Sequence, residues 1–111
     1  MKRYCLALDL IDNATLIAEY EYWHKADNGW PEIRQSIIDS GIINVEIYRI
    51  SNRLFMIMET TNDFSFDKKA ALDARNDVVQ KWEQLMWKFQ QPLPWAKEEE
   101  KWVTMDKIFQ L

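Results

Sequence analysis

The sequence contains a single cysteine, Cys5, and a single histidine, His24. One cysteine excludes a disulfide framework within the chain, and one cysteine with one histidine cannot supply the four ligands of a structural zinc site. Only two glycines and three prolines are present, which excludes collagen-like, linker-like and proline-rich sequences. Glycine-rich phosphate loops, nucleophile elbows and dinucleotide fingerprints are also missing. We therefore expect no metal, no nucleotide cofactor and no serine hydrolysis.

Long apolar runs and an excess of positive charge are missing as well. No stretch approaches the roughly 20 apolar residues that span a bilayer, and no apolar signal segment follows Met1. The net charge of -4 argues against general binding to a nucleic-acid backbone. We expect a cytoplasmic protein that binds neither membranes nor nucleic acid.

The composition is that of one globular domain spanning residues 1–111, with 48% apolar and 29% charged residues. No linker, internal repeat or low-complexity segment divides the chain. Aromatic residues reach 14%, and six of them are tryptophans, which is unusually many for this length. Because tryptophan combines a flat apolar face with an N–H donor, such residues line polar pockets as well as cores.

Hydrophobic periodicity and helix-capping residues predict the order β-α-β-β-α-β, with the first helical region interrupted. The segment 61–76 is expected to be a polar connection with no more than one short helical turn. In chain order the elements are a strand at 3–10, a helix after 12–13 that is broken at 27–29, strands at 42–50 and 53–60, a second long helix capped by Asn76 or Asp77, and a strand at about 102–111.

This order matches the ferredoxin-like α+β fold, in which a four-stranded antiparallel sheet carries its helices on one face. The other face of such a sheet stays bare unless something covers it. The run 54–58 is apolar at every position, which indicates that both faces of its strand are covered. The simplest cover is the sheet of a second copy, so we expect a homodimer in the form of a dimeric α+β barrel.

His24 is the one side chain whose unperturbed pKa lies near neutrality. Tyr20 precedes it by one helical turn and Trp30 opens the next helix, which together suggests acid/base chemistry on a neutral polar ligand. The alternative is a helix-end histidine bonded to backbone, and spacing alone favours it because Y-x-x-x-H is short and common. Periodicity alone likewise favours a core role for Trp82, and Glu83 is more simply a surface charge.

An ordered set of short segments along nearly the whole chain resembles the L-rhamnose mutarotase family. The segments are Glu19-Tyr20-x-x-x-His24, Trp30-Pro31-Glu32-Ile33, Ser40-Gly41, Asn44-x-x-Ile47-Tyr48, Asn52-Arg53-Leu54-Phe55, Gln80-Lys81-Trp82 and Met105-Asp106-Lys107-Ile108-Phe109. The resemblance implies a small dimeric protein of ferredoxin-like fold that interconverts the α and β anomers of 6-deoxyhexoses without cofactor or metal.

The resemblance also implies roles for individual residues. The family's proton-donating histidine falls on His24, its sugar-contacting tyrosine on Tyr20, and the first tryptophan of its Trp-Trp pair on Trp82. The second tryptophan of that pair is Glu83 here, and the family's binding tyrosine after the asparagine of the second strand is Val45. The chain also has about two more residues between its histidine and the next Trp-Pro than the family spacing. These departures leave L-rhamnose and L-fucose both open as the substrate.

The expected site therefore has His24 as the acid, Tyr20 as an orienting and binding group, and Trp30 with Trp82 as walls. Glu83 and Tyr48 are further substrate-binding candidates, although strand alternation could equally point the tyrosine to the other face of the sheet. Two other functions suit the same dimeric barrel: a non-catalytic module that binds a small ligand, and a cofactor-free monooxygenase.

Overall fold

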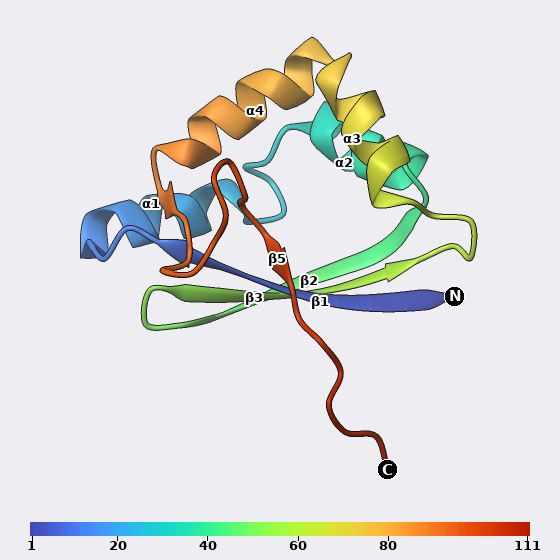
Figure 1. The fold of residues 1–111 in the computed structure, drawn as a ribbon. Coiled ribbons are helices and arrows are strands. Elements are labelled where there is room, and N and C mark those ends of the chain that lie inside the picture. Colours follow the sequence, from blue (N-terminus) through green and yellow to red (C-terminus); the bar gives the residue numbers. More distant parts are fainter.

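One antiparallel sheet forms the base of the molecule, and four helices cover one of its faces (Figure 1). The computed structural model describes all residues from 1 to 111. The predicted ferredoxin-like α+β architecture is confirmed. The elements are β1 (Lys2–Leu10), α1 (Ala14–Trp23), α2 (Pro31–Asp39), β2 (Ile42–Ile50), β3 (Arg53–Thr60), α3 (Phe66–Ala74), α4 (Asp77–Trp87), β4 (Gln90–Gln91) and β5 (Val103–Thr104).

The three long strands lie in the order β2-β3-β1, and the two short strands both pair with β1. Because β3 occupies one edge of β1, β4 and β5 share its other edge, β4 beside Leu10 and β5 beside Leu6. The expected strand at about 102–111 is wrong beyond Thr104. After Met105 donates its N–H to the carbonyl of Cys5, the chain leaves the sheet (Figure 1).

Alternation along the strands separates the two faces of the sheet. Leu6 and Leu8 of β1 are buried beneath the helices. In β3, Leu54 (the partner of Leu8) and Met58 (the partner of Tyr4) are buried on the same face. The intervening residues of β3, such as Ile57, point to the face without helices. The apolar run of β3 therefore places apolar side chains on both faces of the sheet, of which the helices cover one; the cover of the other face stays a prediction.

Side-chain caps fix where three of the helices begin. The Asn13 side chain accepts a hydrogen bond from the N–H of Leu16 at 3.1 Å, and Asn76 caps α4. Pro31 opens α2, where a missing N–H has no cost. The helix α3 was not predicted beyond a single turn. Ser65 caps it, and it buries no residue completely, so its apolar pattern is too weak to be found from periodicity.

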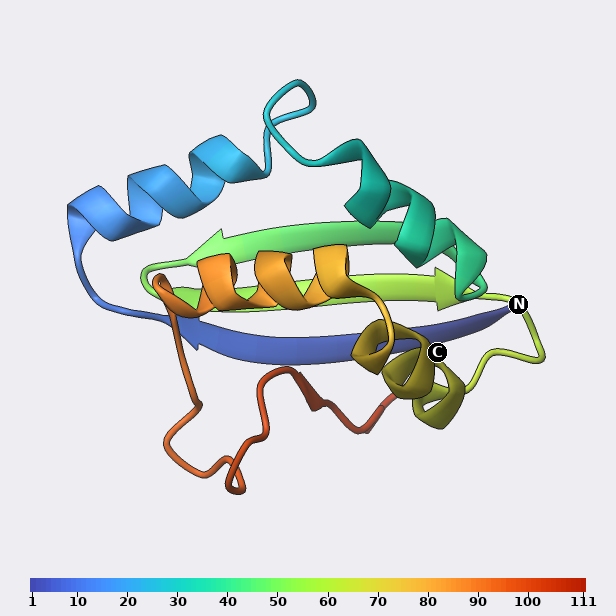
Figure 2. The ribbon, with the colours of Figure 1, turned by 90° about the horizontal axis from the view of Figure 1, so that it is seen from above.

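Figure 2 shows α4 lying over the middle of the sheet, with α1 and α2 along the β2 side and the segment before β5 along the β1 side. The core is split into two clusters beneath these helices, one around Tyr20 and Phe89 and one around Leu6 and Phe64. No helix is long and apolar enough to cross a membrane.

Candidate active site

A pocket of about 790 Å³ lies between the helices and the covered face of the sheet. Its floor is made by β2 and β3, and its walls come from all four helices and from the segment 100–104. Residues of both core clusters line it, so the pocket occupies the place where the core is divided. Five of the six predicted site residues line this pocket: His24, Tyr20, Trp30, Trp82 and Glu83.

His24 lines the pocket as the C-cap residue that follows α1. Its backbone N–H caps the helix by bonding to the carbonyl of Glu21 at 3.1 Å. The residue as a whole is exposed, but its imidazole lies 4.2 Å from the ring centre of Tyr20 and 5.9 Å from that of Trp82. The ring is therefore held in one place by two aromatic neighbours.

The two nitrogens of the His24 ring have different surroundings. Nδ1 lies 2.8 Å from the carbonyl oxygen of Tyr20. Because a carbonyl oxygen only accepts, Nδ1 carries the proton, and Nε2 of the neutral ring has a free lone pair. Burial lowers the pKa of His24 below 6.5, while the bond to the Tyr20 carbonyl opposes that shift. The imidazole is therefore neutral at pH 7, with Nε2 as a proton acceptor.

Tyr20 is buried on the adjacent turn of α1, with 3% of its surface exposed. Burial raises the pKa of its hydroxyl to about 12, and a hydrogen bond with the Gln90 side chain offsets part of this rise. The hydroxyl thus stays protonated at any physiological pH and serves as a donor. The pocket therefore combines a proton acceptor, the neutral ring of His24, with a hydrogen-bond donor, the hydroxyl of Tyr20.

Trp82 is the centre of the aromatic part of the pocket. Its ring centre lies 5.2 Å from that of Trp30 and 6.4 Å from that of Trp23, both in edge-to-face geometry. Trp82 also packs against the core cluster that contains Tyr20, so it has both the core role and the pocket role that the sequence left open.

Trp23 is a pocket residue that the sequence analysis missed. Its indole Nε1–H is buried and has no acceptor within the chain. Such a donor is costly unless a ligand or water accepts from it. The sequence signal that could have identified Trp23 is its position directly before His24.

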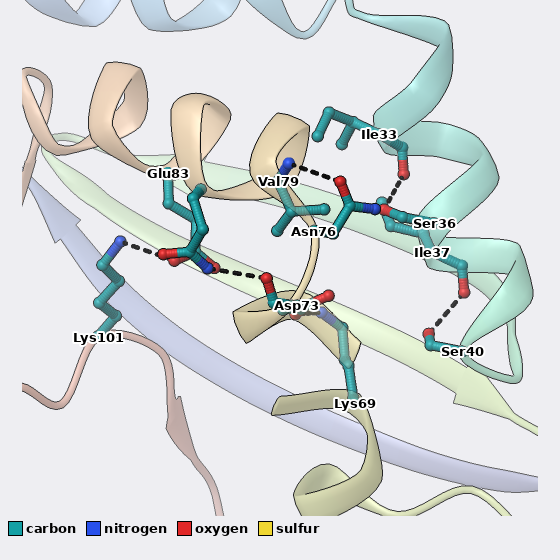
Figure 3. A network of polar contacts seen from close by, with 11 residues as sticks. Ile33, Ser36, Ile37, Ser40, Lys69, Asp73, Asn76, Val79, Glu83 and Lys101 are labelled. Carbon is teal, nitrogen blue, oxygen red and sulfur yellow. Dashed lines mark hydrogen bonds and ion pairs between the residues drawn. The ribbon is translucent and has the colours of Figure 1, made fainter. Parts of the chain in front are cut away.

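Glu83 lines the pocket, on the turn of α4 that carries Trp82. Its carboxylate lies 3.9 Å from the ammonium of Lys101, and both side chains are drawn in Figure 3. Lys101 in turn lies over the ring of Trp87, 4.4 Å from its centre. Burial lowers the pKa of Lys101, and the nearby Glu83 opposes that shift. The polar wall at this point is thus an ion pair rather than a lone carboxylate.

The prediction that Tyr48 binds the substrate is wrong for this pocket, because Tyr48 is not among the residues that line it. It lies opposite Phe55 on the helix-free face, where its hydroxyl donates to Glu46 Oε2 at 2.7 Å. The neighbours Val45 and Ile47 point into the pocket instead. Alternation along β2 therefore places Tyr48 on the wrong face of the sheet for this pocket.

The assembled groups suit proton transfer on a neutral polyol. A neutral imidazole accepts a proton, a phenol donates a hydrogen bond, and indole faces complement C–H surfaces. No group of three or more His, Cys, Asp or Glu side chains is placed to hold a metal ion.

Comparison with known proteins gives a family match over almost the whole chain. The sequence model of the family described as L-rhamnose mutarotase matches residues 3–111. An L-fucose mutarotase from Xanthomonas campestris pv. campestris is 45% identical over 111 residues, covering 100% of this chain and 89% of that protein. A protein of the UPF0734 group from Dictyostelium discoideum is 34% identical, covering 99% of this chain and 90% of that protein.

Two solved structures share the fold. The crystal structure of an L-rhamnose mutarotase from Formosa agariphila has a TM-score of 0.72 at 22% identity, covering 100% of this chain and 99% of that one. Tetracenomycin F2 cyclase from Streptomyces glaucescens, a polyketide cyclase, has a TM-score of 0.59 at 15% identity, again over 100% of this chain and 99% of that one. With the family match over almost its full length, the chain belongs to the L-rhamnose mutarotase family of sugar isomerases.

Proposed function

We propose that this chain interconverts the α and β anomers of a 6-deoxy-L-hexose, with L-fucose and L-rhamnose as substrates. The observation that carries the proposal is the neutral His24 ring, with Nδ1 bonded to backbone and Nε2 free, held against the protonated Tyr20 and the face of Trp82. The 45% identity to an L-fucose mutarotase supports L-fucose as the preferred sugar.

The proposed reaction needs two coupled proton transfers. Nε2 of His24 takes the proton of the anomeric hydroxyl while the bond between C1 and the ring oxygen breaks. The ring oxygen receives a proton from the Tyr20 hydroxyl, or from water bonded to it, and the open-chain aldehyde forms. Rotation at C1 and reversal of these transfers give the other anomer. Positioned acid/base groups of this kind contribute about 10²–10⁴-fold.

This order of events differs from the expectation that His24 acts first as the acid. Because burial lowers its pKa, Nε2 has no proton to give when the sugar arrives. His24 donates only on the return step, after it has taken the anomeric proton. Trp30 and Trp82 bind the C–H face and the methyl group of the deoxysugar.

Two-dimensional exchange NMR with each free sugar tests the proposal. The wild-type chain should accelerate anomer exchange above the spontaneous rate, His24→Ala should abolish most of that gain, and Tyr20→Phe should reduce it. Tyr48→Phe is the matched control, because it removes one hydroxyl outside the pocket and should leave the rate unchanged. An undiminished rate in His24→Ala contradicts the role of His24. No acceleration of either sugar by the wild type would favour a binding module.

We further propose that the chain forms a homodimer through the helix-free face of its sheet. Ala7, Phe55 and Ile57 alternate with the buried core residues and point to this face, and Tyr48 and Ile50 of β2 extend it. The exposed fractions of Tyr48 and Ile50 are 53% and 77%. A contiguous apolar face of this kind favours contact with a second copy.

A further inference from the structure

The pocket is larger than the proposed substrate requires. Pockets of about 300–1,000 Å³ hold drug-sized molecules of two or more rings. The pocket of this chain, at about 790 Å³, lies in the upper part of that range, whereas a 6-deoxyhexose is a single six-membered ring. The His24, Trp30 and Trp82 cluster accounts for only the part of the pocket nearest the end of α1.

A second cluster lines the pocket on the side of α3, away from the end of α1. It consists of Phe66, Lys69 and Asp73. The ring of Phe66 is fixed edge-on by Tyr4, whose centre is 4.9 Å away, and keeps 38% of its surface exposed. Lys69 and Asp73 form an ion pair whose side chains are 27% and 15% exposed.

Stability does not explain an ion pair in this position. A pair that is mostly removed from water contributes little, because desolvation cancels most of its attraction. Its ammonium and carboxylate do supply donors and acceptors at the wall of a pocket, beside a flat apolar ring. That combination is the one found around His24 and Trp82, and it suits a polyhydroxylated ring.

The charges of the pocket wall identify a neutral occupant. Three cationic and three anionic side chains line the pocket, so their sum is zero; they are Arg34, Lys69, Lys101, Asp73, Glu83 and Glu100. Figure 3 shows the residues of the pairs Glu83–Lys101 and Lys69–Asp73, all four of which line the pocket. The Gln80 side chain donates to the backbone carbonyl of Asp73 at 2.9 Å. Lys69 and Lys101 are paired with carboxylates, and the Arg34 guanidinium donates to the carbonyl of Ala26. The wall therefore has no excess positive charge with which to hold a phosphate or a sugar carboxylate.

We propose that Phe66, Lys69 and Asp73 form a second subsite that takes a neutral sugar ring linked to the first. The substrate class is then extended to neutral disaccharides whose reducing residue is a 6-deoxyhexose with a free anomeric carbon. The reducing ring lies at His24 and undergoes the same proton transfers, and the glycosidic bond stays intact. This inference rests on the proposed mutarotase function.

The test compares free L-fucose and L-rhamnose with disaccharides that carry a neutral hexose on a non-anomeric hydroxyl of the same sugars. Exchange NMR should show that the wild type accelerates both classes. Lys69→Met combined with Asp73→Leu removes the ion pair without leaving an unpaired charge. This double variant should keep the free-sugar rate and raise the KM for the disaccharide by about tenfold or more, since charged hydrogen bonds are lost.

Glu21→Leu combined with Arg49→Met is the matched control, because it removes an ion pair that lies outside the pocket. It should change neither rate. Acceleration of the free sugars but not of the disaccharides overturns the subsite and leaves the proposed function intact. An equal loss for both classes in the Lys69/Asp73 variant also overturns it, because the pair would then serve the first ring or the fold. Failure of the wild type on every sugar overturns the proposed function itself.

Discussion

His24 combines two roles that the sequence presents as alternatives. The sequence leaves open either a helix-end histidine bonded to backbone or an acid/base group. In the structure the backbone bond occupies Nδ1 and so leaves Nε2 facing away from it. The helix-end contact therefore fixes the tautomer that a base requires, and the structural role prepares the proposed chemical one.

The lowered pKa of His24 predicts the pH dependence of the proposed reaction. The neutral ring is the active base, and a lowered pKa means that more acid is needed to protonate it. We therefore expect the accelerated exchange rate, after subtraction of the spontaneous rate, to be level near pH 8 and to reach half of that level only at a pH below 6.5. The rate decreases with pH because the ring gains its proton. Exchange NMR from about pH 8 to about pH 5 measures this profile.

His24→Ala provides the baseline for that profile, because its residual rate should lack the acid decrease. A wild-type rate that already reaches half of its level above pH 6.5 would contradict the lowered pKa. A rate that rises as the ring becomes protonated would restore His24 as the initial acid.

Glu83 is the residue at which sugar preference is expected to be encoded. It lines the pocket where the family has the second tryptophan of a pair, so it replaces a flat apolar wall with a carboxylate paired to Lys101. Glu83→Trp should change the ratio of the L-fucose and L-rhamnose exchange rates, by about tenfold and toward L-rhamnose, because hydroxyl contacts dominate discrimination between epimers. Exchange NMR on both sugars gives this ratio directly.

Glu83→Gln separates charge from shape in the same experiment. It retains hydrogen-bonding capacity and should shift the ratio less than the tryptophan does. Identical ratios in the wild type and in Glu83→Trp would show that Glu83 does not contact the sugar, and the specificity argument would fail at that residue.

At the scale of elements, α4 is the helix that carries the pocket wall. Its buried residues Val79 and Met86 line the pocket together with Trp82 and Glu83. The first turn of α4 is held by the Asn76 side chain, which accepts from the N–H groups of Val78 at 3.1 Å and of Val79 at 3.3 Å. The position of the wall therefore depends on a cap outside the pocket.

Asn76→Ala is expected to lower the free energy of unfolding by about 1 kcal/mol, the usual effect of losing such a cap. Urea denaturation followed by tryptophan fluorescence measures this change. Asn76→Asp should restore most of the stability, because aspartate caps helices equally well. An unchanged unfolding midpoint in the alanine variant would show that α4 is held by packing alone.

The sequence predicts those elements whose signals are local. The strands β2 and β3 agree with their predicted bounds, because alternation and the Ser51-Asn52 turn are both encoded nearby. The helix α2 ends shortly before Gly41, whose φ of 96° is a conformation that favours glycine. The helix α3 and the end of β5 at Thr104 depend on contacts with distant parts of the chain. Hydrophobic periodicity, which is a local signal, does not predict such contacts.

The same distinction holds for the pocket. Tyr20 and His24 could be paired from their spacing on one helix, and the structure places them 4.2 Å apart between ring centres. Lys69 and Lys101 could not be found, because α3 and the segment before β5 reach the pocket only through the fold. Tyr48 was uncertain for a local reason, since a shift of one residue along a strand reverses the face.

At the scale of the whole molecule, the two faces of the sheet have different roles. The helix-covered face contains the pocket. The other face carries Phe55, Ile57 and the exposed Ile50. The C-terminal segment extends toward this side with Ile108 and Phe109 exposed at 95% and 76% (Figure 1). Apolar surface left open on one side of the chain supports the proposed interface between copies.

Ile57→Glu is expected to convert the proposed homodimer into a monomer. The substitution places a charge near the middle of the helix-free face, where a dimer of ordinary size would bury about 800 Å² from each partner. Sedimentation velocity or light scattering coupled to size-exclusion chromatography distinguishes the two masses. Ile38→Glu is the matched control, because Ile38 is 62% exposed on α2 and its replacement should leave the dimer intact.

Activity provides the second measurement for this prediction. Because the pocket lies on the helix-covered face, away from the proposed interface, monomeric Ile57→Glu should retain its exchange rate per chain. A monomeric wild type would contradict the proposed interface, and a dimer that persists in Ile57→Glu would place the contact elsewhere. If the monomeric variant loses exchange while its circular dichroism is unchanged, the partner must complete the site, and the pocket of one chain is then insufficient for the reaction.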